Sequence, residues 1–138
     1  EILIPIERKF GALTVTYGFT SSKLAAYISK HASTGTAPQL DQHATCELNS
    51  KNNEISKRTG SACDFIVANH SMAEITRFII KNLSFDRIYY FGDIRPIHVS
   101  ISDEPVKHLQ IMCESSAGRR YPGKKAFGDN AILLAESL

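Results

Sequence analysis

The sequence predicts an α+β domain with a mainly antiparallel sheet flanked by two or more helices. Three observations lead to this expectation. Several short runs alternate apolar and polar residues, two amphipathic segments follow serine caps, and turn residues separate the runs. Residues 1–138 are enough for a single domain with a real core, and the polar residues 47–59 are expected to form a loop insertion in it.

The first half of the chain contains one expected strand and one expected helix. Residues 12–19 alternate apolar and threonine side chains, which is typical of a strand. Ser21 or Ser22 can then cap a helix that runs to His31. Residues 32–42 have the composition of a loop, and it leads directly into the polar insertion.

The second half predicts a strand at 62–68, followed by a helix. The spacing of Ser71 and Glu74 matches a capping box at the start of this helix. Residues 86–91 and 95–101 predict a hairpin that turns at the Gly-Asp pair, and 108–115 predicts one more strand. Residues 117–130 are expected to be loop, before a short apolar run at 131–135.

The composition fits a soluble globular protein. A net charge of +2 is too small to indicate nucleic acid or an anionic membrane as the main partner, and no apolar run reaches a membrane-spanning length. The three cysteines are too few, and odd in number, for a disulfide scaffold, and the absence of a C-x-x-C pair argues against a thiolate zinc finger. With no signal-peptide pattern at the start, we expect a cytoplasmic location; the oligomeric state stays open.

Two polar residues interrupt apolar strands. His98 lies on the face of its strand opposite Ile97 and Val99, and Asp64 sits inside the run "ACDFIVA", where an unpartnered carboxylate would be costly. His43, in "LDQHATC", could join them. Two histidines and one aspartate make a plausible zinc set that leaves a fourth position for water. His31, His70 and His108 are better explained as surface residues.

The order of these pieces resembles the zinc D-alanyl-D-alanine carboxypeptidase family, which includes phage endolysin-type peptidases and the related hedgehog-like fold. The similarity rests on "TYGFTSS" at 16–22, "DQH" at 41–43, "GSACDF" at 60–65, "FDRIYYFGD" at 85–93 and "RPIHVSI" at 95–101. It implies His43, Asp64 and His98 as ligands of a zinc ion and a peptide of the cell-wall type as substrate. It also implies a hedgehog- or peptidase-like fold.

The chain departs from the family pattern at several positions. The segment 47–59 separates His43 from Gly60, and an alignment without this gap would put Lys57 in the histidine position. Thr20 replaces the family's turn arginine, which leaves recognition of a substrate carboxylate open. No glutamate lies near His98 to act as general base.

Asp93 and Arg95 are the catalytic candidates near the last histidine. Asp93 is the nearest carboxylate and could be the base, or it could simply form the turn with Gly92. Arg95 could stabilise an oxyanion or hold a substrate carboxylate, or it could pair with Asp93 or Asp103.

Three functions remain open from the sequence. The first is a zinc-dependent hydrolase, a metallopeptidase that uses a zinc-activated water. The second is a non-catalytic binding module on the same fold. The third is a zinc hydrolase of another bond, such as a phosphodiester, which the four basic residues Arg119, Arg120, Lys124 and Lys125 would suit.

Overall fold

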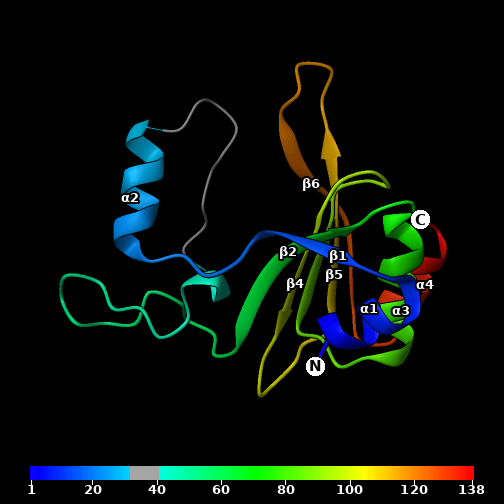
Figure 1. Ribbon diagram of the computed structural model, residues 1–138, viewed down its shortest axis with the longest axis horizontal. Helices are drawn as coiled ribbons and strands as arrows, with labels where there is room; N and C mark the ends of the chain where they lie inside the picture. Colours follow the sequence, from blue (N-terminus) through cyan, green and yellow to red (C-terminus); the bar gives the residue numbers. More distant parts are fainter. Residues whose placement is uncertain (32–40) are drawn as a thin grey trace.

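The computed structural model describes residues 1–31 and 41–138, and these form an α+β structure around one mixed sheet (Figure 1). The strands are β1 (Leu13–Tyr17), β2 (Ser61–Val67), β3 (Arg87–Tyr90), β4 (Ile97–Ile101), β5 (His108–Glu114) and β6 (Arg120–Phe127). Their order in the sheet is β1-β2-β4-β3-β5-β6. Neighbouring strands are antiparallel except for β3 and β5, which are parallel. The predicted mainly antiparallel α+β class is therefore confirmed.

The helices do not cover the two faces of the sheet equally. In the described residues they are α1 (Leu3–Phe10), α2 (Ser22–His31), α3 (Met72–Asn82), α4 (Asn130–Glu136) and the short 3-10 helix η1 (Gln42–Ala44). Figure 1 shows α1, α3 and α4 gathered on one side of the sheet, with α2 and the loop after η1 extending on the other. The site described below occupies this second, less covered side.

The hydrophobic core lies between the sheet and the first group of helices. The alternating residues Phe65, Val67, Ile97 and Val99 point into it, because a strand directs successive side chains to opposite faces. Ser71 is the N-cap of α3, as predicted, and its hydroxyl accepts a hydrogen bond from the Glu74 backbone N–H at 3.2 Å. This end of the fold therefore forms as its local sequence predicts.

Several elements differ from the sequence predictions. Residues 3–10 form a helix that was not predicted, and its Ile6 is fully buried. The loop prediction for 117–130 is wrong for most of its length, because 120–127 form β6 against β5. The apolar run that follows is the helix α4, and its Ala131 and Ala135 reach the core. The expected loop at 32–42 falls largely outside the described residues.

The polar insertion is only partly a surface loop. Leu48 and Glu54 form an isolated antiparallel bridge, and Leu48 is half exposed. Ser56, in contrast, is buried, and the residues after it contact the sheet. Of the helices described, none is both long and apolar enough to cross a membrane.

Candidate metal centre

Asp64 and His98 face each other across the strands β2 and β4. They are direct partners in the antiparallel register, so their side chains leave the sheet on the same face. Gly60 makes this register possible at the start of β2. Its φ is +104°, and a Cβ there would collide with the Ile101 carbonyl oxygen on β4.

His43 reaches the same place from η1. The Asp41 carboxylate accepts a hydrogen bond from the His43 backbone N–H at 3.0 Å, and the His43 carbonyl accepts one from the Thr20 N–H at 2.9 Å. The His43 ring is buried, and its Nδ1 lies 2.8 Å from the Gly18 carbonyl oxygen. A carbonyl oxygen only accepts, so Nδ1 carries the proton and Nε2 is the atom that faces Asp64 and His98.

Three atoms that can bind a metal meet in a small triangle. His98 Nδ1 lies 3.0 Å from His43 Nε2 and 3.0 Å from Asp64 Oδ1. The third side, from His43 Nε2 to Asp64 Oδ1, is 3.2 Å. His43 Nε2 and Asp64 Oδ1 each offer a lone pair, and His98 Nδ1 offers one in the tautomer that carries its proton on Nε2. In that tautomer the triangle needs a proton or a cation at its centre, whereas a proton on His98 Nδ1 can itself be donated to the other two atoms.

The charges in the triangle shift the pKa values of His43 and Asp64. Burial alone would lower the pKa of His43, but the hydrogen bond and charge of Asp64 and the charge of Asp41 outweigh it and raise the pKa. Burial alone would raise the pKa of Asp64, but hydrogen bonds from His43 and His98 and the charges of both rings lower it. Both shifts favour a negative carboxylate beside a positive partner.

Aromatic rings enclose the two histidines. The Tyr17 ring meets the His43 ring edge-on at a centroid distance of 4.8 Å. The Tyr89 ring stacks on His98 at 4.8 Å, with 27° between the ring planes. These contacts hold both imidazoles in one orientation and limit their contact with water.

The site also contains a carboxylate that sequence reasoning did not assign. An Asp41 oxygen and one ring nitrogen each of His43 and His98 all lie within 4.8 Å of one another. In the sequence, Asp41 is marked only by its place two residues before His43. This place becomes informative once η1, which Asp41 caps, brings both residues to the sheet. Asp41 is thus a second carboxylate beside the histidines.

A cleft opens next to the triangle. It has a volume of about 340 Å³, and its lining includes Asp41, Tyr89 and His98. The other side of the lining is basic, with Lys57, Arg58 and Arg87. A small substrate in this cleft would lie against His98 and Asp41.

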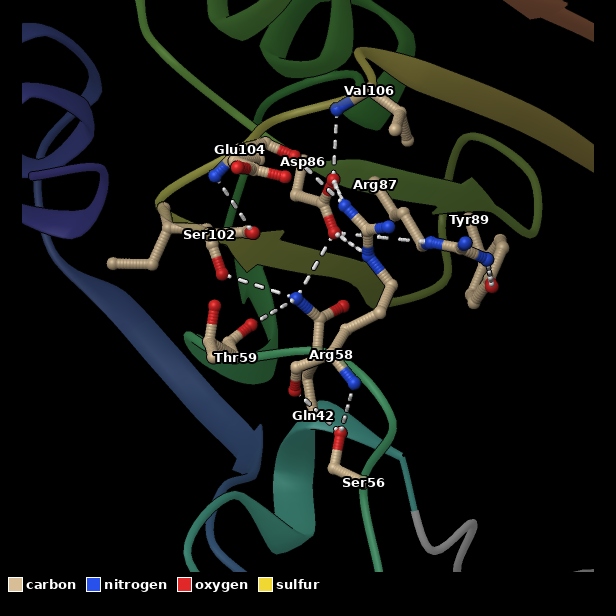
Figure 2. A network of polar contacts seen from close by, with 11 residues as sticks. Gln42, Ser56, Arg58, Thr59, Asp86, Arg87, Tyr89, Ser102, Glu104 and Val106 are labelled. Carbon is tan, nitrogen blue, oxygen red and sulfur yellow. Dashed lines mark hydrogen bonds and ion pairs between the residues drawn. The ribbon is translucent and has the colours of Figure 1, made fainter.

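A buried polar network holds η1 against the sheet (Figure 2). The fully buried Asp86 accepts hydrogen bonds from Arg58 at 2.9 and 2.7 Å, from Gln42 at 3.0 Å and from the Val106 N–H at 2.9 Å. The Gln42 amide also donates to the Thr59 and Ile101 carbonyl oxygens, at 3.0 and 3.1 Å. Because Gln42 precedes His43, this network fixes the position of that histidine.

The pKa of Asp86 shows that the network favours its charged form. Burial alone would raise the pKa, but the Arg58 hydrogen bonds, the Val106 N–H and Gln42 together lower it below its usual value. The carboxylate therefore stays charged and paired at neutral pH. Sequence analysis identified none of these residues, since their partners lie far apart along the chain.

The structure brings three of the five predicted site residues together and places the other two elsewhere. Asp93 contacts the start of α3, where it accepts hydrogen bonds from the Ser71 hydroxyl and from the Ala73 N–H at 2.9 Å. Arg95 forms an exposed ion pair with Glu114 at 2.9 Å, not with Asp93 or Asp103. Both residues thus have structural partners.

The other predicted histidines and basic residues lie outside the triangle. His31 is exposed and His70 lies beside Glu74, as surface residues would. His108 does not fit the surface prediction, because it is buried and its ring stacks on Phe127 at 4.4 Å. Arg119 and Arg120 are exposed at the β5–β6 turn, and Lys124 and Lys125 are exposed on β6.

Cys63 faces the core, opposite Asp64, as the alternation of β2 predicts. It packs against the apolar cluster, and burial together with the Asp64 charge raises its pKa to about 11. A thiol with such a pKa is protonated at neutral pH and is a poor metal ligand.

Comparison of the chain with models of known families, with curated proteins and with solved structures finds no match.

Proposed function

We propose that this protein is a zinc-dependent hydrolase, a metallopeptidase that uses a zinc-activated water. The observation that carries the proposal is the meeting of His43 Nε2, Asp64 Oδ1 and His98 Nδ1 at 3.0–3.2 Å beside a cleft. Two histidines and one carboxylate form a three-ligand set of the kind that leaves a fourth position for water or substrate.

The spacing of the three atoms fits zinc. Bonds of about 2.0–2.1 Å at tetrahedral angles put ligand atoms about 3.3 Å apart, close to the sides of the triangle. The hydrogen bond from His43 Nδ1 to the Gly18 carbonyl is the outer contact that orients a histidine ligand. These features support the resemblance to the D-alanyl-D-alanine carboxypeptidase family, and we propose the chain as a divergent member with that fold.

Zinc in this position would supply an acidified water and would polarise a substrate carbonyl. The protein's own part is to hold the ligands, exclude bulk water and take up a proton. We assign the proton-accepting role to Asp41 in preference to Asp93. Asp41 lines the cleft near both histidines, whereas Asp93 is outside the cleft lining and is bonded to the start of α3. Arg95 is likewise engaged with Glu114.

Hydrolysis of another bond, such as a phosphodiester, is the second candidate. The observation that favours it is the basic lining of the cleft, with three cationic side chains. A non-catalytic module would need no metal, since protons on the histidines could satisfy the triangle. Metal content and activity therefore separate the three functions.

The deciding experiment measures zinc by elemental analysis in the purified protein and in His43→Ala, Asp64→Ala and His98→Ala. We expect close to one zinc per chain, lost in each variant, while the control His31→Ala at an exposed position keeps it. The zinc-loaded protein is then assayed on cell-wall-type peptides and on phosphodiesters, with Asp41→Asn as the base variant. Zinc that is absent, or insensitive to all three changes, refutes the metal centre.

A further inference from the structure

The cleft beside the triangle has an uneven distribution of charge. Among the described residues that line it, Lys57, Arg58 and Arg87 are basic and Asp41 is the one carboxylate. The three cations differ in how far other side chains already neutralise them. This difference indicates which of them can bind a ligand.

The Arg58 side chain is used in hydrogen bonds within the fold. It makes two short hydrogen bonds to the buried Asp86 carboxylate and one to the Glu104 carbonyl oxygen, at 2.9 Å. Such a paired geometry uses most of the guanidinium's donors. Arg58 therefore stabilises the network and has little capacity left for a ligand.

Arg87 is much less engaged. Its Nε is buried and has no hydrogen-bond partner within residues 1–31 and 41–138, and it forms only a long ion pair with the Asp86 carboxylate, at 3.8 Å. That carboxylate already accepts bonds from Arg58 and Gln42. The one hydrogen bond Arg87 donates by its side chain goes to the Tyr89 hydroxyl and is long, at 3.5 Å (Figure 2). A guanidinium has five N–H donors, so most of those on Arg87 remain unused.

Lys57 adds a second positive charge at the same cleft. It is exposed, and no carboxylate in the described part of the chain lies within ion-pair distance of it. Arg87 is on β3, two residues from Tyr89, and its ladder partner Ser100 is two residues from His98. That offset is about 7 Å along a strand, so Arg87 and His98 can contact one small molecule.

We propose that Arg87 and Lys57 form a subsite for an oxyanion, a carboxylate or a phosphate group of the substrate. The subsite rests on the proposed function only for the idea that a reacting bond lies at His98. A planar guanidinium binds such groups through paired N–H donors, and the lysine adds a point charge. Substrates with an anionic group about 7 Å from the reacting bond are therefore preferred.

The test is an NMR titration of the full chain that follows the Nε–H signals of its arginines. Inorganic phosphate and acetate are the two probes, because their response separates a phosphate from a carboxylate preference. We expect the Arg87 signal, identified by its absence in Arg87→Gln, to move while the Arg119 signal does not. In Arg87→Gln, binding of the preferred anion, followed on the backbone signals of the cleft, weakens about tenfold or more.

Lys57→Gln, at an exposed position, keeps the test valid if the arginine variant does not fold. This variant should weaken binding of the anion about threefold, as expected for the loss of one partly solvated charge. The control Lys51→Gln should leave binding unchanged. An Arg87 signal that ignores both anions overturns the subsite.

Running the titration before and after chelator treatment separates the two proposals. Anion binding at Arg87 in a protein that takes up no zinc when zinc is supplied would refute the metal centre and leave the subsite. Zinc binding without an Arg87 response would refute the subsite and leave the metal centre.

Discussion

The two faces of the sheet differ in the side chains that the same strands present: one face is apolar and the other carries polar groups. On the face toward α1, α3 and α4, residues such as Phe65, Ile88 and Ile97 are fully buried among apolar neighbours. On the other face, Asp64 and His98 contact each other, and the buried His108 has no hydrogen-bond partner among the described residues. Burial stabilises the first face, and on the second it makes polar groups dependent on partners.

The largest expected effect is on the apolar face. Phe65→Ala should lower the free energy of unfolding by about 3–5 kcal/mol, because it removes a fully buried ring and leaves a cavity. Asp64→Ala, at the neighbouring position on the opposite face, should lower it by only about 1 kcal/mol in chelator, since Asp64 remains partly exposed and only its hydrogen bonds are lost. Urea denaturation measures both. Equal losses would mean that the two faces do not differ in this way.

A smaller effect is expected at His108, on the polar face. Burial, followed by the charges of Arg87 and Lys125, lowers its pKa below 6.5, so the folded state disfavours the protonated ring. The stability that depends on a neutral His108 is therefore complete above pH 6.5 and is lost as the pH falls toward the lowered pKa.

His108→Phe keeps the ring stack on Phe127 and removes two unpartnered nitrogens. It should raise the free energy of unfolding by about 1 kcal/mol and remove this part of the acid dependence. Denaturation at pH 5 and pH 7, with His31→Phe as the exposed control, measures the difference. A variant with the full acid dependence of the parent protein would show that His108 is not its source.

The smallest effect is expected at Arg95. Its ion pair with Glu114 is exposed on both sides, so Arg95→Gln should change the free energy of unfolding by less than about 0.5 kcal/mol. Zinc content and hydrolysis should also stay unchanged, because the ion pair lies outside the triangle and the cleft lining. A large loss of hydrolysis with unchanged stability would support the catalytic role that the sequence predicted.

Local pattern explains why two of the candidate residues share one face of the sheet. The alternation in "ACDFIVA" and "RPIHVSI" puts Asp64 and His98 opposite their apolar neighbours, and the structure has them so. His43 was proposed from its place before the polar insertion and from the family resemblance, and only the docking of η1 brings its ring to the other two residues. The serine cap of α3 was likewise readable, because a cap depends on four consecutive residues.

The alternation of side chains along a strand is local geometry, so the sequence by itself determined which residues share a face with Asp64 and His98. Only the tertiary structure decided that Asp41 joins them, that Asp86 anchors Gln42, and that Arg87 keeps its donors unused at the cleft. The same holds for β6, whose Gly and Lys residues indicate a loop until β5 provides the partner for its backbone. These features depend on contacts between distant segments, and no local pattern of residues records such contacts.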